Sequence, residues 1–172
     1  SDNHLKIKRD FQKTSNFNFV SVIGSGNYSS RILIPAFYKA GAQFKFIASP
    51  GGIDLVRSAK KYKFVSATTN TNDVFEDHES DSVLIATRHD SHSDLVIKAL
   101  KAKKNVFVEK PLCLTSEELN DIQKVYTGEN ILMVGFNRRF SPLTLRLKEF
   151  LEETIEPKAF IYTCNAGFIP ND

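Results

Sequence analysis

Short apolar runs alternate with helix-like segments along most of this sequence, and the alternation constrains the fold more than any other feature. Six runs predict strands, at residues 17–24, 44–49, 63–68, 81–87, 105–110 and 130–136. Five segments predict helices, at residues 27–41, 52–62, 92–102, 115–127 and 138–153. Strands joined through helices imply parallel strands connected by right-handed crossovers. We therefore predict a doubly wound α/β fold around a parallel sheet.

The strand segments are apolar on both faces, and several helix ends carry recognisable signals. The runs VLIA, VFV and ILMV have no polar alternation, which is typical of a sheet covered on both sides. Asn27 is expected to cap the first helix and Gly41 to end it. Thr115 and Glu118 have the spacing of a capping box. Pro35 lies inside the first predicted helix, where it should disturb the preceding turn.

The pattern divides the chain into three parts. Residues 1–16 are polar without clear periodicity and predict a linker or tail. Residues 17–138 form the predicted doubly wound domain. Residues 139–172 predict a connecting helix and, within 158–172, the first strand of a C-terminal α+β sheet domain that is truncated here.

Composition excludes several classes of protein. Hydrophobic residues make up 41% and charged residues 25%, as in ordinary soluble domains, and the net charge is only +3. A lysine cluster at residues 98–104 indicates either a solvated helix end or a nucleic-acid contact, and no nucleic-acid-binding motif accompanies it, so we predict no nucleic-acid partner. No apolar run reaches ~18 residues and no signal peptide is visible, which predicts a protein without a membrane span.

The cysteines point to a reducing compartment. The two cysteines, Cys113 and Cys164, are far apart and neither belongs to a Cys-x-x-Cys pair. This argues against a zinc site and against a disulfide framework, and it favours a cytoplasmic location.

A glycine-rich loop follows the first predicted strand. Gly24-Ser25-Gly26-Asn27-Tyr28-Ser29 has the pattern Gly-x-Gly-x-x-Ser and leads into the first helix. In dinucleotide-binding loops the first glycine permits the turn, the second lets the backbone approach a pyrophosphate, and the third position needs a small residue. The helix N-terminus then faces the anion. The alternatives are a structural glycine turn and a site for another nucleotide-like ligand.

The second predicted strand ends without the acidic residue that often binds a ribose hydroxyl of NAD. Ser49 stands at or near that position, in the segment IASPGG. A serine can bond either to a hydroxyl or to a phosphate, so the sequence leaves the choice between NAD and NADP open. The other interpretation is a plain Ser-Pro-Gly turn.

Polar residues gather after the strand at 81–87. Thr87, Arg88, His89 and His92 lie in or beside the loop that follows it, at the carboxyl edge of the predicted sheet, where ligands bind in such folds. The histidines are either ligand contacts or exposed polar side chains. They do not predict a metal site, because no third or fourth ligand accompanies them.

The next strand ends in Glu109-Lys110-Pro111, and here the sequence resembles a known family. The Gly-x-Gly loop, the IAT…H…H strand end, VFVEKP and VGFNRRFSP together resemble the glucose-fructose oxidoreductase / inositol dehydrogenase family, Gfo/Idh/MocA. The similarity covers about residues 17–150. The tail NAGFIPND resembles members found in bacterial polysaccharide-biosynthesis clusters, where such a domain can follow an alcohol dehydrogenase domain.

The resemblance implies a Rossmann domain that binds NAD or NADP and serves hydride transfer to or from a sugar, cyclitol or nucleotide-sugar carbon. It also implies a homo-oligomer in the full-length protein. The implied pyrophosphate contacts are Gly24, Gly26, Asn27 and Tyr28. The implied contacts of the nicotinamide half are Thr87 and His92, with Glu109 near the ribose, Lys110 as the catalytic residue beside the nicotinamide, and Pro111 after a cis bond. Ser49, Arg88 and His89 complete the candidate cofactor-binding set.

Two departures from the family pattern stand out. Arg88 and His89 occupy positions where members usually have a small residue or proline followed by asparagine. The second catalytic element of the family, an Asp-x-x-x-His pattern in the C-terminal domain, is absent up to Asp172. Arg138 or Arg139 either reaches the cleft or forms structural ion pairs.

Three classes of function follow. The first is the cofactor domain of an oxidoreductase, which by itself should bind cofactor with little turnover. The second is a dinucleotide sensor that acts through a partner protein, although such a sensor has no need of Lys110. The third is a methyltransferase-like fold, which would bind S-adenosylmethionine and leaves Glu109-Lys110-Pro111 unexplained.

Overall fold

The computed structural model describes residues 4–6, 19–50, 53–153, 155–163, 165 and 167. The chain separates into two compact units, Ser1–Phe136 and Asn137–Asp172, and each is described by itself. The domain ranges expected from the sequence stay predictions.

In the described part of the first unit there are seven strands with helices between them. The strands are β1 (His4–Lys6), β2 (Phe19–Ile23), β3 (Gln43–Ala48), β4 (Ser66–Thr68), β5 (Ser80–Ile85), β6 (Asn105–Val108) and β7 (Leu132–Val134). The helices are η1 (Ser29–Leu33, a π-helix), α1 (Ile34–Lys39), α2 (Ile53–Lys61), α3 (Asn72–Glu76), η2 (His89–Ser91, a 3₁₀-helix), α4 (His92–Lys101) and α5 (Ser116–Val125).

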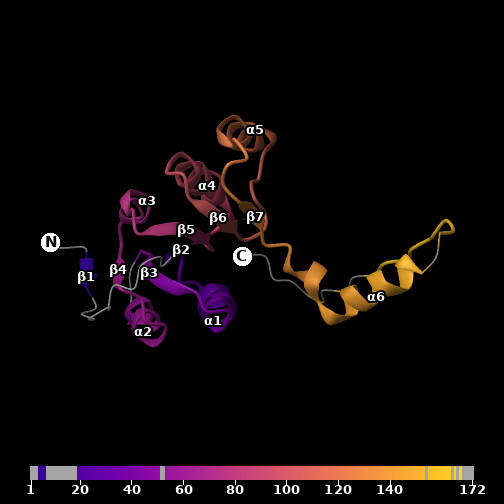
Figure 1. Cartoon of the computed structure of the whole chain (residues 1–172), viewed down its shortest axis with the longest axis horizontal. Helices are drawn as coiled ribbons and strands as arrows, with labels where there is room; N and C mark the ends of the chain where they lie inside the picture. The colour runs from indigo at the N-terminus through magenta and orange to yellow at the C-terminus, as the bar shows by residue number, and fades with distance from the viewer. Residues whose placement is uncertain are drawn as a thin grey trace. The chain divides into compact units, whose positions relative to one another are not determined.

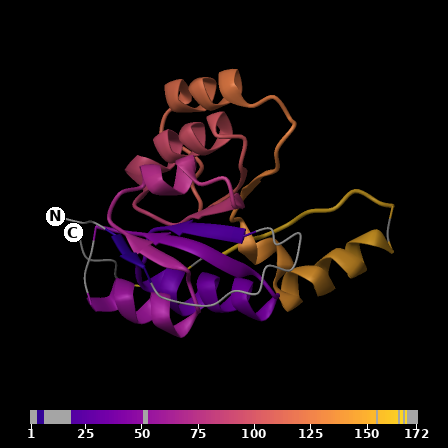
Figure 2. The same ribbon diagram turned by 60° about the vertical axis from the view of Figure 1, so that its left-hand side comes forward.

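The strands form one sheet with the order β1-β4-β3-β2-β5-β6-β7. The six strands from β4 to β7 pair in parallel, and β1 pairs antiparallel with β4. Helices α1 and α2 cover one face, and α3, α4 and α5 cover the other (Figures 1 and 2). The doubly wound α/β fold predicted from the sequence is therefore confirmed.

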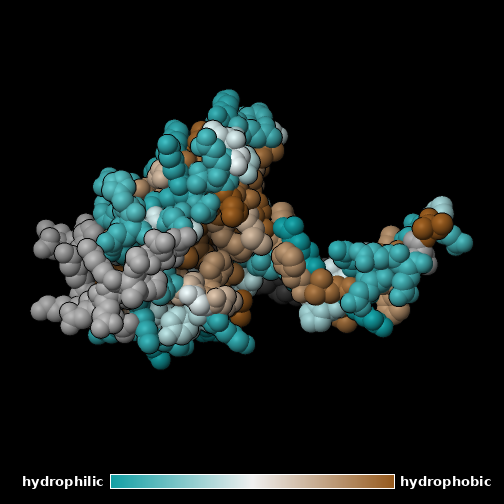
Figure 3. Space-filling model, viewed as in Figure 1, coloured by the Kyte–Doolittle hydropathy of each residue, from teal (hydrophilic) through white to brown (hydrophobic). Residues whose placement is uncertain are grey.

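The core lies on both sides of the two central strands. Val22 and Leu84 belong to the buried cluster on the α1 and α2 side, whereas Ile23, Val83 and Ile85 belong to the cluster on the α4 and α5 side. Alternate residues of a strand point to opposite faces, so a strand buried on both faces must be apolar throughout. The outer surface over α3 and α4 is hydrophilic (Figure 3).

The first helix has a different cap residue from the one predicted, and its first turns are irregular. Asn27 is already helical, and the carbonyl of Gly26 accepts the first helical bond, from the Ser30 amide. The prediction that Asn27 caps this helix is therefore wrong, because Gly26 occupies the cap position. Pro35 disturbs the helix as expected. The turn before it is a π-helix, in which the Ile34 amide donates to the Ser29 carbonyl.

Two predicted helix signals are confirmed. Gly41 has a φ of +93°, and the Ala42 amide donates to the Phe37 carbonyl, which completes a left-handed helix end. At α5 the Thr115 side chain accepts from the Glu118 amide and the Glu118 side chain accepts from the Thr115 amide, as a capping box requires.

Two other segments differ from the sequence analysis. Within the predicted tail, β1 adds an edge strand that the sequence analysis did not predict, because three residues carry no readable periodicity. The strand predicted within 158–172 is wrong for residues 158–163, which have no regular structure. Strands need hydrogen-bonded neighbours, and Phe160, Ile161 and Tyr162 are exposed. The rest of that prediction falls largely on residues outside the described ones.

The second unit consists mainly of helix. It contains the 3₁₀-helix η3 (Asn137–Phe140) and α6 (Pro142–Glu152). The Ser141 side chain caps α6 by accepting from the Thr144 amide, and Pro142 occupies its first turn, where a missing N–H costs nothing. Among the described residues, no helix is long and apolar enough to cross a membrane.

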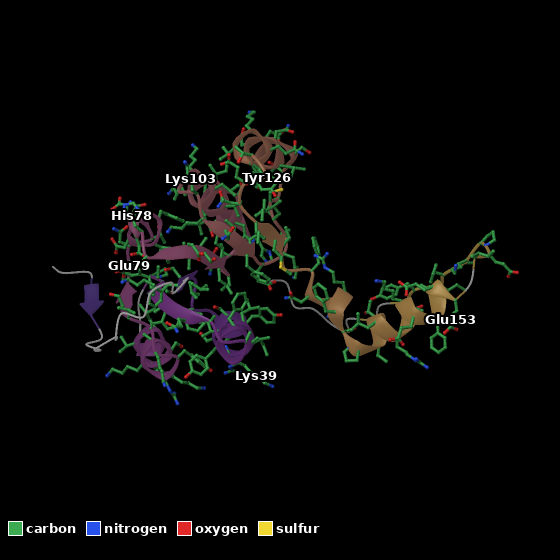
Figure 4. The ribbon with its side chains drawn as sticks, in the orientation of Figure 1. Lys39, His78, Glu79, Lys103, Tyr126 and Glu153 are labelled. Atoms are coloured by element: carbon green, nitrogen blue, oxygen red, sulfur yellow. The ribbon has the colours of Figure 1, made fainter. Side chains whose placement is uncertain are left out.

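A buried lysine closes the edge of the sheet at which β5 and β6 begin. Lys104 is 3% exposed, and its Nζ donates to the carbonyl oxygens of Asp77 and Ser80 at 2.7 and 2.5 Å. Burial lowers the pKa of this ammonium from its ordinary value of 10.5, while the carboxylates of Asp77 and Asp81 oppose the shift. At the same edge Glu79, labelled in Figure 4, forms an ion pair with Lys45.

We expect Lys104→Met to lower the free energy of unfolding by about 1–3 kcal/mol, because two buried carbonyls lose their donor. Since the pKa of Lys104 is lower in the folded state, the folded chain loses this proton first as pH rises. The free energy of unfolding of the parent chain, relative to that of Lys104→Met, should therefore increase as pH rises from the lowered pKa of Lys104 toward 10.5. Urea unfolding across alkaline pH, with exposed Lys101→Met as the control, measures this. A pH-independent difference would contradict it.

Candidate functional site

The glycine loop starts with a residue that no other amino acid can replace without moving the neighbouring strand. Gly24 has a φ of +102°, and a Cβ there would lie 2.3 Å from the Ala86 carbonyl oxygen. Its amide donates to the Ala48 carbonyl at 2.8 Å. The loop after β2 is thus held between the ends of β3 and β5, which explains the first glycine of the motif.

The second glycine faces open space. Gly26 is exposed, and a Cβ built on it would meet no atom within 4 Å. Asn27 and Tyr28 are also exposed, in the first helical turn after it. We call the open space beside Gly26, at the start of the helix, the cradle. A phosphate group fits such a cradle, because helix N-terminal amides point toward it.

The serine in the third position is accommodated by hydrogen bonding. Ser29 is buried, and its hydroxyl donates to the Gly24 carbonyl at 2.8 Å. The Ser30 hydroxyl donates to the Ser25 carbonyl at 2.9 Å. These two bonds fasten the loop to its own helix, so serine at this position supports the turn as well as fitting the space.

Ser49 follows β3 and is linked to the glycine loop. Its hydroxyl accepts from the Ser25 hydroxyl at 2.8 Å, and its amide donates to the Thr68 carbonyl at the end of β4. Ser49 therefore lies at the same edge of the sheet as Gly24, one strand away. Its hydroxyl stands at the position where NAD-binding folds often have a carboxylate.

The loop after β5 carries Thr87, Arg88 and His89. Thr87 is partly buried, and its hydroxyl is 2.7 Å from the Ser91 hydroxyl, which donates to the Arg88 carbonyl. Arg88 and His89 are exposed. The loop is therefore ordered by its own short polar side chains, while its two larger side chains reach the surface.

His92 lies beneath this loop. Its side chain is 0% exposed, with Nδ1 at 2.6 Å from the Pro111 carbonyl oxygen and Nε2 at 3.3 Å from the Thr87 carbonyl oxygen. Of the residues proposed from the sequence as contacts of the nicotinamide half, Thr87 reaches the sheet edge and His92 is enclosed behind it.

The Glu-Lys-Pro corner follows β6. The Glu109 amide donates to the Ile85 carbonyl at 2.9 Å, and the Glu109 carboxylate accepts from the Lys110 amide. The Lys110 side chain is exposed, and the Lys110-Pro111 bond is cis, as predicted. The corner thus directs a lysine outward at the carboxyl edge, while the glutamate turns back onto the backbone.

Sequence reasoning missed the role of Gly135. This glycine follows β7, donates its amide to the Val108 carbonyl and is buried. A Cβ there would lie 2.8 Å from Oε1 of Glu109 and 3.2 Å from the Phe107 ring. The missing side chain at Gly135 therefore leaves room for the Glu109 carboxylate. The sequence signal for this was a glycine directly after an apolar strand, in the segment VGF.

The segments after four neighbouring strands meet at one edge of the sheet. The order β3-β2-β5-β6 places Ser49, the glycine loop, Thr87 and Glu109-Lys110 side by side, because parallel strands present their carboxyl ends together. Such an edge suits an extended ligand with a phosphate near its centre. Among the described residues, no group of three or more His, Cys, Asp or Glu side chains could hold a metal ion.

The arginines suggested from the sequence belong to the second unit. Arg138 and Arg139 are exposed in η3, and the Arg139 guanidinium lies 5.4 Å from the centre of the Phe140 ring. Their contribution to the site stays a prediction.

Comparison with known protein families identifies the chain. Residues 18–136 match the Gfo/Idh/MocA family, described as an oxidoreductase family with an NAD-binding Rossmann fold. The chain belongs to this family. The resemblance stated from Glu109-Lys110-Pro111 is confirmed, and the family description agrees with the prediction of NAD or NADP as cofactor.

Similar proteins are dehydrogenases of sugars and cyclitols. The chain is 39% identical over 101 residues to a myo-inositol 2-dehydrogenase of Thermotoga maritima, covering 58% of this chain and 30% of the relative. A putative myo-inositol dehydrogenase from Sinorhizobium meliloti superposes with a TM-score of 0.71 at 26% identity, covering 79% of this chain and 41% of that one. A levoglucosan dehydrogenase in complex with NADH and L-sorbose gives a TM-score of 0.69 at 28% identity, covering 79% and 38%.

The chain spans less than half the length of these Gfo/Idh/MocA relatives. The family model matches residues 18–136, within the first unit, which holds the glycine loop and the Glu-Lys-Pro corner.

We expect Gly135→Ala to displace the Glu109 carboxylate, because the new Cβ would overlap Oε1. The Lys110 amide would lose its acceptor and exchange with solvent faster, by up to about tenfold for one weak hydrogen bond. Amide hydrogen exchange followed by NMR measures this. Glu109→Ala should reproduce the effect, and Gly135→Ala should add nothing to it. An additional effect in the double variant would show that Gly135 acts through another group.

Proposed function

We propose that this chain is the cofactor-binding portion of an NAD(P)-dependent oxidoreductase that transfers a hydride to or from a sugar, cyclitol or nucleotide-sugar carbon. The observation that carries the proposal is the convergence of the glycine loop, Ser49, Thr87 and Glu109-Lys110 on one edge of the sheet. A dinucleotide is an extended ligand, and in this fold class it lies across the carboxyl ends of the strands.

The pyrophosphate is assigned to the cradle above Gly26. The cradle is open at the glycine, since a Cβ at Gly26 meets no atom within 4 Å. Backbone amides at the start of the helix would donate to the phosphate oxygens, and the exposed Asn27 and Tyr28 lie beside them.

The adenosine half is assigned to the β3 side, next to Ser49. The Ser49 hydroxyl is held by Ser25 and carries no negative charge, so it would bond to a ribose hydroxyl without repelling a phosphate. Ser49 is therefore compatible with both NAD and NADP, and a titration with each cofactor measures which one the chain binds more tightly.

The nicotinamide half is assigned to the side of β5 and β6. When bound, the cofactor supplies or accepts the hydride. Thr87 and the exposed Arg88 and His89 border this part of the edge, and Glu109 is assigned to the neighbouring ribose. The Lys110 side chain is exposed there, where it would hold the substrate oxygen. Its neutral amine would take the hydroxyl proton as the carbon is oxidised, and its ammonium would return a proton to the oxygen as the carbon is reduced.

The relatives support the class of substrate. Those that match this chain act, by their names, on inositols and levoglucosan, which are ring compounds with several hydroxyl groups. We propose that this chain alone binds cofactor with little turnover, and that residues beyond its 172, present in the longer relatives, complete the substrate site and an oligomer interface.

Calorimetric titration with NADH and NADPH, and with S-adenosylmethionine as the alternative ligand, tests the proposal. We expect one or both dinucleotides to bind and S-adenosylmethionine not to bind. Gly26→Val should weaken dinucleotide binding by about tenfold or more, because its side chain fills the cradle. The melting temperature is the control, and it should stay unchanged because no protein atom is displaced. Unchanged affinity in Gly26→Val would remove the glycine loop from the phosphate site.

The role of Lys110 is tested in a chain extended to the length of its relatives. We expect Lys110→Ala to lower turnover by about a hundredfold or more while the cofactor affinity changes only a few-fold, because the lysine acts on the substrate proton. Lys103→Ala, in the exposed turn after α4 (Figure 4), serves as the matched control. Near-normal turnover of Lys110→Ala would exclude the lysine from the reaction, whereas a lack of turnover in the extended parent chain itself would favour a sensor that binds the cofactor without chemistry.

A further inference from the structure

A single buried imidazole joins the two loops that border the nicotinamide side of the proposed site. His92 is the first residue of α4 and is 0% exposed. Its Nδ1 lies 2.6 Å from the carbonyl oxygen of Pro111, and its Nε2 lies 3.3 Å from the carbonyl oxygen of Thr87. One partner belongs to the corner after β6, and the other to the loop after β5.

The shorter of the two contacts shows which ring nitrogen of His92 carries a hydrogen. A carbonyl oxygen only accepts hydrogen bonds, so at 2.6 Å the Nδ1 atom must carry the hydrogen. The Nε2 contact is longer, at 3.3 Å, and it is a hydrogen bond only when the ring carries a second proton, because the Thr87 carbonyl oxygen also only accepts. The stronger bond therefore holds Pro111, the residue directly after Lys110.

Nothing in this arrangement lets His92 touch a ligand at the edge. Its ring is enclosed, and the exposed His89 ring stacks edge-on against it at 5.7 Å between centroids. The loop after β5, which contains Thr87, is held together by a hydrogen bond between the Thr87 and Ser91 hydroxyls. His92 can influence a bound molecule only by setting where Thr87 and the Lys110-Pro111 corner stand.

The order of the strands decides which part of a dinucleotide would respond. Ser49 follows β3 and the cradle follows β2, so the adenosine and pyrophosphate lie on that side. The two carbonyls held by His92 follow β5 and β6, on the other side of the cradle. A change at His92 would therefore act on the nicotinamide half and leave the adenosine half untouched.

We propose that His92 is a positioning residue for the nicotinamide half of the cofactor, holding the Thr87 loop and the Lys110-Pro111 corner at a fixed separation without contacting the cofactor itself. This inference rests on the proposed function. It also separates His92 from Thr87, with which the sequence had grouped it as a direct contact.

The test compares NADH with ADP-ribose, which lacks the nicotinamide ring, by calorimetric titration of the parent chain, His92→Leu and His92→Asn. Leucine fills much of the space and makes neither bond, whereas the asparagine amide can present an N–H near the position of Nδ1. We expect His92→Leu to weaken NADH binding by about tenfold and to weaken the binding of ADP-ribose, which keeps the ribose assigned to Glu109, by a clearly smaller factor. His92→Asn should restore most of the NADH affinity.

A merely structural role would give a different result. If His92→Leu weakened both ligands by the same factor, or weakened neither, the proposal would be overturned. Melting temperatures identify variants that fail to fold. Should His92→Leu be one of them, His92→Gln, whose amide reaches toward the Nε2 position, replaces it. The His92→Asn variant should then bind NADH more tightly than the His92→Gln variant, by a larger factor than for ADP-ribose, and equal NADH affinities would contradict the proposal.

The parent chain separates this inference from the proposed function. A parent chain that binds neither NADH nor ADP-ribose would contradict the proposed function and this inference together. A parent chain that binds both, with a His92→Leu variant that loses both alike, would contradict only the role of His92.

Discussion

The close approach of Gly24 to Ala86 is the constraint on which the rest of the site depends. A Cβ on Gly24 would lie 2.3 Å from the Ala86 carbonyl, so the loop after β2 and the end of β5 can meet only across a glycine. That contact places the loop after β2 against the loop after β5. Because the neighbouring strands are parallel, the loops after β3 and β6 lie at the same edge of the sheet. The loops that follow these four strands therefore lie in a row along one edge of the sheet.

The loops at this edge are held by polar groups that bond to the protein's own backbone. Ser29 bonds to the Gly24 carbonyl, His92 to the Pro111 carbonyl, and Glu109 to the Lys110 amide. Buried polar groups need such partners, and each bond also fixes a loop. The residues left exposed, among them Gly26 and Lys110, are those that the proposed function requires to face a ligand.

Much of the fold could be predicted from the sequence, because strands buried on both faces must be apolar throughout and their helices carry end signals such as Gly41 and Thr115. The residues that make up the edge were predictable because each follows a strand. The place of His92 was not, since a sequence gives its position after β5 but not the depth at which the ring is enclosed. Gly135 was visible as a glycine directly after an apolar strand, but its contact with Glu109 and the pairing of β1 join distant segments, and no local pattern records such contacts.

Amide chemical shifts of the 172-residue chain, measured by NMR during a titration with NADH, test the central claim most directly. The account predicts that the shifts change at the glycine loop, Ser49, Thr87 and Glu109, and that they stay constant at the opposite edge, around Ser80 and Asn105. Changes confined to that opposite edge, or no change at saturating NADH, would contradict the assignment of the cofactor to the carboxyl ends of the strands.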